Sequence, residues 1–226
     1  MKLYMHPASN ASRPVLLYIA EKNIACENVM IDLMKGEHYS DSYTAINPNR
    51  LVPTLEDGDF RLTESSAILK YLASKFEYPE YPTKDLQKRA RVDEVMDWFN
   101  TQFYRDFGYG LVYPQLYPHH KRPSDEIHDG VIDWGKEKAE GWFELLDQHW
   151  LGDKQYLTGN EITIADYFGA SLATIGEVVR CDLSHYPNVT RWLGNMKKLE
   201  SWPKVNEAMA GFAAAVKDQP FKAIKP

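Results

Sequence analysis

The sequence predicts an α/β domain followed by an all-helical domain. Short apolar segments alternate with helical ones only before residue 77, and a stretch with two prolines interrupts this pattern at residues 77–83. Strand patterns largely vanish beyond that point. The 226 residues are enough for two domains that each bury a core, and we place these domains at residues 1–78 and 86–226.

The composition is that of a globular protein with an acidic balance. Hydrophobic residues make up 44% of the chain, and the net charge is −6 with neither half basic, so we expect no nucleic-acid partner. No apolar run is long enough to span a membrane, and the N-terminus lacks a signal peptide's apolar segment, so we expect a cytoplasmic protein without a membrane partner. Cys26 and Cys181 predict neither a disulfide framework nor a metal site.

The start of the chain predicts a βαβ unit. Residues 2–5 and 28–32 have strand patterns, and residues 13–22 carry apolar side chains at helical spacing. Ser12 is the predicted N-cap of this helix, and Pro14 lies in its first turn, where a missing N–H costs little.

A ββα pattern follows. Residues 52–56 and 60–63 predict a hairpin around an Asp-Gly turn at residues 57–58, and residues 65–76 predict a helix.

The second half predicts about five helices. The first is expected to bend near Gly108 and Gly110, because glycine is a poor helix former. Thr163 and Asp166 have the spacing of a capping box at the start of a buried helix, and we expect their role to be structural. The helical patterns cover residues 86–113, 125–150, 163–179, 189–199 and 205–216.

The loop at residues 6–12 is the first candidate for chemistry. It leads from a strand into a helix N-terminus, where the helix dipole and unpaired N–H groups favour an anion. The hydroxyls of Ser9 and Ser12 could therefore stabilise an oxyanion or a thiolate. The alternative is that these serines only cap the helix.

Two further features lie at a strand start and a helix start. Pro53 could leave the N–H and C=O groups of Val52 free to pair with a peptide-like ligand, although an ordinary strand entry explains it equally well. Ser65 is expected to cap a helix whose amides suit a ligand carboxylate, and Glu64 could pair with an ammonium group, although capping alone also explains both. Together the three features describe a groove for a short zwitterionic peptide.

This pattern resembles the serine-type cytosolic glutathione transferases, which include the phi, theta and delta classes. The resemblance covers nearly the whole chain. It implies a thioredoxin-like domain of βαβ–ββα order, an all-helical domain that contributes a hydrophobic acceptor site, and a homodimeric cytoplasmic enzyme of detoxification. The matching motifs are HPASNASR at residues 6–13, NP at 47–48, VPTL at 52–55, DG at 57–58, LTESSAI at 62–68, RVDE at 91–94, Trp98, and TIAD at 163–166.

The resemblance implies that Ser9 hydrogen-bonds the glutathione sulfur and favours the thiolate, the form that attacks electrophiles. Ser12 is the alternative for this role. The resemblance also implies that Val52, ahead of a cis Pro53, pairs main chain to main chain with the cysteinyl part of glutathione. Because serine occupies both positions of a Cys-x-x-Cys spacing, disulfide exchange through this loop is disfavoured.

The two ends of glutathione are assigned in the same way. The resemblance implies that Glu64 and Ser65 hold the γ-glutamyl ammonium and carboxylate, and that His38 and Arg50 meet the glycyl carboxylate. Ser66 stands where many serine-type members carry arginine, which either weakens this part of the glutamyl pocket or shifts its charge elsewhere.

The acceptor pocket is expected between the domains, where residues 98–117 hold eight of the 29 aromatic side chains. Phe99, Phe103 and Phe107 repeat every four residues and are expected in the helix core. Tyr104 and Tyr113 lie off that stripe and are the candidate walls of the pocket. An aromatic lining suits flat apolar electrophiles.

We therefore expect a glutathione transferase whose co-substrate is glutathione, whose second substrate is a small apolar electrophile, and which uses no metal. Reduction of organic hydroperoxides is a further expected activity. Two alternatives remain at this point. One is a protein of this fold that binds a partner without catalysis, and the other is a specialised glutathione-dependent isomerase or dehalogenase.

Overall fold

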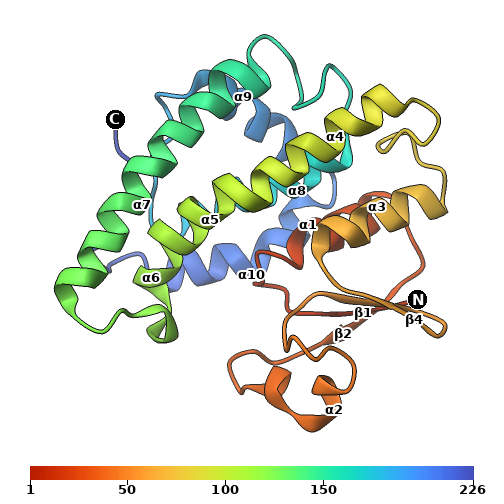
Figure 1. The fold of residues 1–226 in the computed structure, drawn as a ribbon, viewed down its shortest axis with the longest axis horizontal. Coiled ribbons are helices and arrows are strands. Elements are labelled where there is room, and N and C mark those ends of the chain that lie inside the picture. The colour runs from red at the N-terminus through yellow and green to blue at the C-terminus, as the bar shows by residue number, and fades with distance from the viewer.

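The computed structural model describes residues 1–226 and consists of a four-stranded sheet followed by a set of helices (Figure 1). The strands form one sheet in the order β2-β1-β3-β4, in which only the β1–β2 pair is parallel. This arrangement confirms the predicted βαβ and ββα units. The strands are β1 (Lys2–Met5), β2 (Glu27–Met30), β3 (Thr54–Asp57) and β4 (Phe60–Leu62).

Two helices, α1 (Arg13–Glu21) and α3 (Ser65–Lys75), cover one face of the sheet, and the short α2 (Asp41–Thr44) lies on the other side (Figure 1). Leu3 on β1 pairs with Leu55 on β3, and both side chains are fully buried. Removing these apolar side chains from water is the main force that holds the helices against the sheet.

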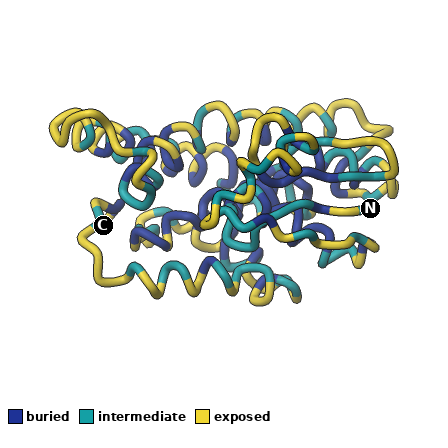
Figure 2. The backbone as a smooth tube through the Cα atoms, turned by 90° about the horizontal axis from the view of Figure 1, so that it is seen from below, coloured by how far each residue is buried: buried dark blue, intermediate teal, exposed yellow.

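Beyond residue 85 the chain is helical, as predicted. All ten residues of α8 are buried, so this helix forms the centre of the second half. Figure 2 shows buried segments gathered in the middle of the molecule and exposed segments along the outer helices. The helices are α4 (Leu86–Trp98), α5 (Tyr104–Asp106), α6 (Tyr113–Leu116), α7 (Asp125–Leu145), α8 (Ile164–Ala173), α9 (Pro187–Met196) and α10 (Trp202–Ala215).

Helices α4, α5 and α6 follow one another without a loop, because wider π-helical segments join them. These segments span Phe99–Phe103 and Phe107–Val112, and the second contains both Gly108 and Gly110, where the sequence predicts a bend. A π segment changes the angle between successive side chains. Residues beyond it therefore face a direction that an unbroken α-helix would not give them.

One hydrophobic core runs through both halves of the chain. Helix α1 packs against α8, where the rings of Tyr18 and Tyr167 meet edge to face with centroids 5.0 Å apart. The segment between the halves is also fixed, since the Glu80 side chain pairs with Lys22 and the Glu80 carbonyl accepts from the Ile164 N–H at 3.1 Å. The domain limits at residues 78 and 86 stay a prediction.

Three local expectations need correction. Asp57 pairs with Phe60 as the last residue of β3, so the hairpin turn consists of Gly58 and Asp59 rather than of an Asp-Gly pair. Strand β3 begins only after Pro53, and β2 begins one residue before the predicted start.

None of the helices combines the length and the apolar character that crossing a membrane requires.

The predicted capping box at the start of α8 is confirmed. The Asp166 carboxylate accepts from the Thr163 N–H and hydroxyl, at 2.8 and 2.9 Å, and from the Leu157 N–H and the Trp192 Nε1–H, both at 2.9 Å. Burial raises the pKa of Asp166 to about 6, against the four donors that favour its charged form. The side chain thus ties α8 to α9 and to the loop before α8.

Helix α7 crosses the second π segment at a contact between two glycines. A Cβ atom added to Gly135 would lie 2.4 Å from the carbonyl carbon of Gly110. Only glycine at residue 135 permits the backbones to come this close.

Gly135→Ala is expected to lower the free energy of unfolding by about 3 kcal/mol, because the added methyl group meets backbone that cannot move aside. The control is Gly141→Ala on the same helix, where an added Cβ meets nothing within 4 Å. This control should leave the stability unchanged or raise it by about 0.5–1 kcal/mol. Urea unfolding of both variants measures the difference, and equal effects would contradict the close contact.

Asp166→Ala is expected to cost about 4 kcal/mol of unfolding free energy, because three buried N–H groups lose their acceptor. Thr163→Ala should cost only about 1 kcal/mol, since the Thr163 N–H keeps its bond to Asp166. The same urea experiment ranks the two. If Asp166→Ala lowers the free energy of unfolding no more than Thr163→Ala does, the role given to the Asp166 carboxylate is contradicted.

Candidate active site

The loop between β1 and α1 is held by short-range hydrogen bonds. The Ser9 N–H donates to the His6 carbonyl at 2.9 Å, and the Ser12 and Arg13 N–H groups both donate to the Ser9 carbonyl at 3.0 Å. The Ser9 hydroxyl oxygen accepts from the Ser12 N–H at 3.3 Å, while its proton has no acceptor within the chain. Because Ser9 is partly exposed, this proton is available to a ligand.

Ser12 differs from Ser9 in its access to solvent. It occupies the N-cap position of α1, as predicted, but its side chain makes no capping hydrogen bond. It is fully buried, and its hydroxyl oxygen accepts only from the His6 N–H, at 3.5 Å. A ligand that arrives from solvent meets Ser9, so the geometry favours Ser9 over Ser12.

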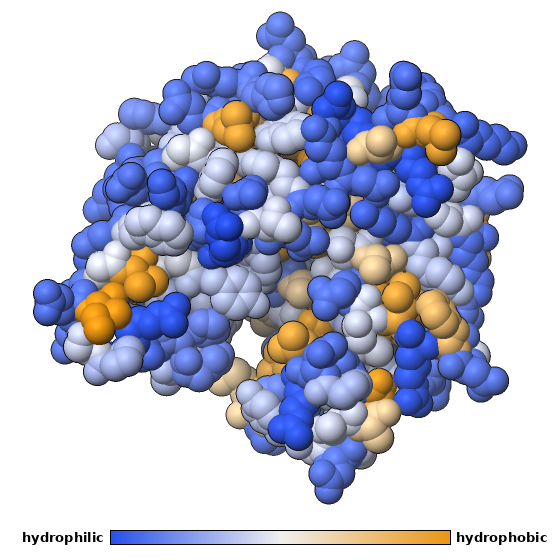
Figure 3. All heavy atoms as spheres, in the orientation of Figure 1, coloured by the Kyte–Doolittle hydropathy of each residue, from blue (hydrophilic) through white to orange (hydrophobic).

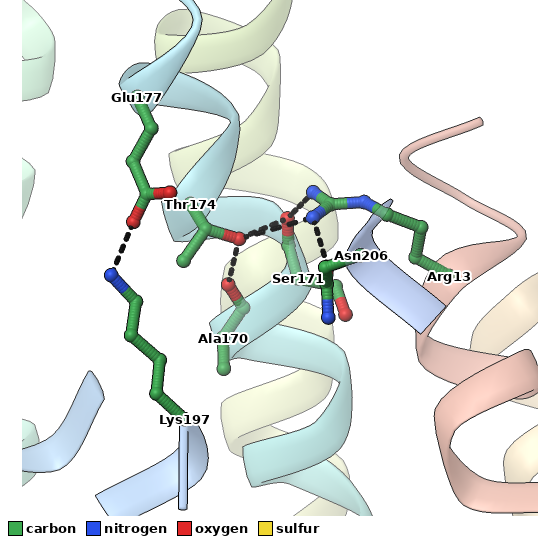
Figure 4. A network of polar contacts seen from close by, with 7 residues as sticks. All are labelled: Arg13, Ala170, Ser171, Thr174, Glu177, Lys197 and Asn206. Atoms are coloured by element: carbon green, nitrogen blue, oxygen red, sulfur yellow. Dashed lines mark hydrogen bonds and ion pairs between the residues drawn. The ribbon is translucent and has the colours of Figure 1, made fainter. Parts of the chain in front are cut away.

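Arg13 lies buried between the two halves of the molecule and has no carboxylate partner (Figure 4). Its Nη1 donates to Asn206 Oδ1 at 2.6 Å and to Thr174 Oγ1 at 3.3 Å. Its Nη2 donates to the Ser171 carbonyl at 2.6 Å and to Asn10 Oδ1 at 2.5 Å. Burial lowers the pKa of Arg13 to about 10, so the guanidinium stays charged at neutral pH. It joins the Ser9 loop to α8 and α10.

The loop before β3 presents unpaired backbone. A cis peptide joins Val52 to Pro53, as the resemblance implies, and neither the N–H nor the C=O of Val52 bonds to another residue. The preceding carbonyl, of Leu51, accepts from the Tyr43 hydroxyl at 2.6 Å and from Asn47 Nδ2 at 2.8 Å. These two side chains fix the loop while the Val52 groups remain free.

The start of α3 carries a backbone conformation that non-glycine residues rarely adopt. Glu64 has φ 65° and ψ 113° and is the N-cap, while Ser65 is the first helical residue, which corrects the prediction that Ser65 is the cap. The Glu64 side chain makes no capping hydrogen bond, so its carboxylate is left for other partners. Ser66 accepts from Asn100 Nδ2 at 3.2 Å, which links this end of α3 to the helical half.

The two candidate cations for the glycyl end lie on the loop between β2 and β3. Arg50 is exposed and has a left-handed backbone, with φ 57°. Burial, and after it the nearby His119, lower the pKa of His38, and its Nδ1 has no hydrogen-bond partner. A neutral imidazole attracts a carboxylate only weakly, so Arg50 is the stronger candidate.

The aromatic side chains of residues 98–117 fall into a buried group and a partly exposed group. Phe99, Phe103 and Phe107 are fully buried in the core. Tyr104 and Tyr113 are partly exposed, and their hydroxyls hydrogen-bond each other. Burial of these hydroxyls raises the pKa of both tyrosines, so both are protonated at neutral pH.

Figure 3 shows the surface hollowed between the part that carries α2 and the helical half, beside the start of α1. A separate shallow hollow, lined by Gly141 and His149 among others, lies on the outer side of α7 and contains none of the candidate residues.

Cys26 and Cys181 are both free, and burial raises the pKa of both thiols, for Cys181 to about 11. Neither sulfur is a reactive thiolate at neutral pH.

Comparison with known proteins agrees with this geometry. The family model for the glutathione S-transferase N-terminal domain matches residues 1–74, and that for the glutathione S-transferase C-terminal domain matches residues 135–200. Human glutathione S-transferase theta-1 is 35% identical over 167 residues, which cover 74% of this chain and 69% of that protein. The chain belongs to the glutathione S-transferase family.

Solved structures of this family share the fold. Human glutathione transferase theta-2, in complex with glutathione and an unknown ligand, has a TM-score of 0.85 at 27% identity and covers 100% of this chain and 93% of its own. The unclassified glutathione S-transferase 2 from Bombyx mori has a TM-score of 0.82 at 30% identity, with 100% and 99% covered. These matches confirm the predicted family, the thioredoxin-like and helical fold class, and the enzyme class.

Sequence reasoning gave no role to four residues of this candidate site, namely Asn10, Arg13, Tyr43 and Asn47. Arg13 carried a usable signal, because a cation in the first turn of a helix opposes the helix dipole and therefore indicates a specific set of acceptors. The other three gave no such signal, since their partners become visible only once the loops are folded.

Arg13→Met is expected to lower the free energy of unfolding by about 3 kcal/mol, because four acceptors, three of them buried, lose their donor. It should also lower kcat, because Asn10 loses the bond that fixes the Ser9 loop. Arg122→Met is the control, since Arg122 is exposed and its guanidinium has no partner. Urea unfolding and turnover measure both effects, and a stable, fully active Arg13→Met would contradict this role.

Proposed function

We propose that this transferase conjugates glutathione to small apolar electrophiles and that Ser9 holds the glutathione sulfur as a thiolate. One observation carries the proposal. The Ser9 hydroxyl accepts from the Ser12 N–H, keeps a free proton and is partly exposed at the N-terminal end of α1. An N–H that bonds the hydroxyl oxygen polarises the O–H group and makes it a stronger donor to a negatively charged sulfur.

The start of α1 adds to this effect, because the dipole of a helix stabilises an anion near its first turn. The thiolate is the nucleophile, so a lower thiol pKa increases the reactive fraction at neutral pH. Water takes the proton that the thiol releases, and no protein base is required.

The rest of glutathione would lie along the groups left unpaired by the fold. The free N–H and C=O of Val52 suit the cysteinyl main chain, next to Pro53. Glu64 and Ser65 suit the γ-glutamyl ammonium and carboxylate. His38 and Arg50 suit the glycyl carboxylate, with the exposed Arg50 as the main cation. The theta-2 relative solved with glutathione supports the choice of ligand.

The electrophile would lie beside the sulfur, against Tyr104 and Tyr113 as the walls of the acceptor pocket. Substitution, addition and hydroperoxide reduction all begin with attack by the same thiolate, so one site serves all three. The unpaired groups at Ser9 and Val52 favour catalysis over partner binding alone. Homodimer formation and a cytoplasmic location stay predictions.

Ser9→Ala is expected to lower kcat about 100-fold with an aryl halide electrophile, because it removes the donor to the thiolate. Glutathione affinity, measured by calorimetry, should change only a few-fold, since the groups that hold the peptide remain. Ser12→Ala should keep most of kcat, because this buried hydroxyl does not meet the ligand. If Ser9→Ala keeps full activity and Ser12→Ala loses it, Ser12 rather than Ser9 holds the sulfur. If the wild type does not bind glutathione at millimolar concentration, the proposed glutathione-dependent activity is contradicted.

A further inference from the structure

The Ser9 loop starts with a tight turn whose first residue is His6. The Ser9 N–H donates to the His6 carbonyl at 2.9 Å, which closes a β-turn over residues 6–9. Pro7 occupies the second position of this turn, where its fixed φ is favoured. Ser9 is the last residue of the turn, so the shape of the turn sets the position of the Ser9 hydroxyl.

The imidazole of His6 folds back over this turn. Its Nδ1 atom accepts from the Ala8 N–H at 3.2 Å, two residues along the chain. Asn and Asp side chains make the same contact when they begin a turn, with an oxygen in place of the imidazole nitrogen. The Ala8 N–H has no other acceptor within the chain, so the turn depends on this side chain.

The backbone of His6 also contacts the other end of the loop. The His6 N–H lies 3.5 Å from the Ser12 hydroxyl oxygen, and the Ser12 N–H donates to the Ser9 hydroxyl at 3.3 Å. His6 therefore contacts the chain on both sides of Ser9. A change at His6 is passed directly to the hydroxyl that would hold the sulfur.

The bond to Ala8 requires a neutral His6. An imidazole nitrogen that accepts carries no proton, so the ring proton of His6 lies on Nε2, and a second proton would turn Nδ1 into a donor. Two N–H groups would then face each other. Burial holds the pKa of His6 below its ordinary value of about 6.5, although the nearby Asp32 carboxylate, which pairs with Lys35, favours the charged form. At neutral pH the bond is intact.

We propose that His6 is a positioning residue for the transferase reaction, whose neutral imidazole fixes the turn that presents the Ser9 hydroxyl to the glutathione sulfur. Protonation of Nδ1 would release the turn at acidic pH. His6 acts through Ser9 rather than on the sulfur itself. This inference rests on the proposed function, because it requires Ser9 to hold the thiolate. It adds an acidic limit to the reaction that is separate from protonation of the thiol.

Two variants separate the acceptor at His6 from its proton. His6→Asn keeps an acceptor for the Ala8 N–H, because the amide oxygen replaces Nδ1, and this oxygen does not titrate at these pH values. His6→Leu removes the acceptor at every pH. His185→Asn is the control, since His185 is exposed and lies in the loop before α9.

The test measures kcat with benzyl chloride and saturating glutathione between about pH 5 and about pH 8. At the upper end His6→Asn should stay within about threefold of the wild type, and His6→Leu should lose about tenfold, because a turn without its acceptor misplaces Ser9. As the pH falls below about 6.5, the wild type should lose about tenfold relative to His6→Asn and approach His6→Leu. The ratio of wild type to His185→Asn should stay constant.

The place of the imidazole proton is measured independently of turnover by nitrogen NMR of the histidine rings. The chain has seven histidines, and the His6 signals are those that disappear in His6→Asn. We expect a protonated Nε2 and a bare Nδ1 at neutral pH. Neither this measurement nor the comparison of the wild type with His6→Asn depends on the stability of His6→Leu.

Three results would each overturn the inference while the proposed function stands. They are a constant ratio of wild type to His6→Asn over the whole pH range, full kcat of His6→Leu at neutral pH, and a protonated Nδ1 at neutral pH. A wild type that turns over no glutathione at any pH would instead overturn the proposed function, and this role of His6 with it.

Discussion

Arg13 donates four hydrogen bonds inside the molecule, and its acceptors come from the Ser9 loop, from α8 and its C-terminal end, and from α10. A buried cation without a counter-ion is costly, and the cost is offset only while all these acceptors keep their positions. The guanidinium therefore fixes three parts of the chain relative to one another. The place of Ser9 against the helical half, and the orientation of the Asn10 amide, both depend on this contact.

Several polar groups of the candidate site are unpaired. They include the Ser9 proton, the backbone groups of Val52 and the Asn10 Nδ2 group. The buried Asp166 carboxylate, by contrast, accepts from four donors. An unpaired polar group costs stability, and a ligand that pairs with the Ser9, Val52 and Asn10 groups would offset that cost. The hollow beside the start of α1 gives that ligand access (Figure 3).

Local patterns in the sequence predicted most of the fold, but they could not predict contacts between residues that are distant in the sequence. Apolar periodicity and the capping box gave the strands and helices to within a few residues, and loops at strand ends indicated Ser9 and Val52. The positive φ of Glu64 moved the cap from Ser65 and left no mark in the sequence. The partners of Arg13, up to 193 positions away, depend on tertiary packing. The Tyr104–Tyr113 pair was hidden because helical spacing places these residues on opposite faces until a π segment intervenes.

The pKa of the glutathione thiol in the complex tests the central claim most directly, because every feature around Ser9 is argued to favour the thiolate. It can be measured from the ultraviolet absorbance of the thiolate as the pH is raised, with the protein saturated by glutathione. We expect the bound thiol to titrate at least about one pH unit below free glutathione, whose pKa should lie near the ordinary cysteine value of about 8.5. Bound and free thiols that titrate at the same pH would contradict the account.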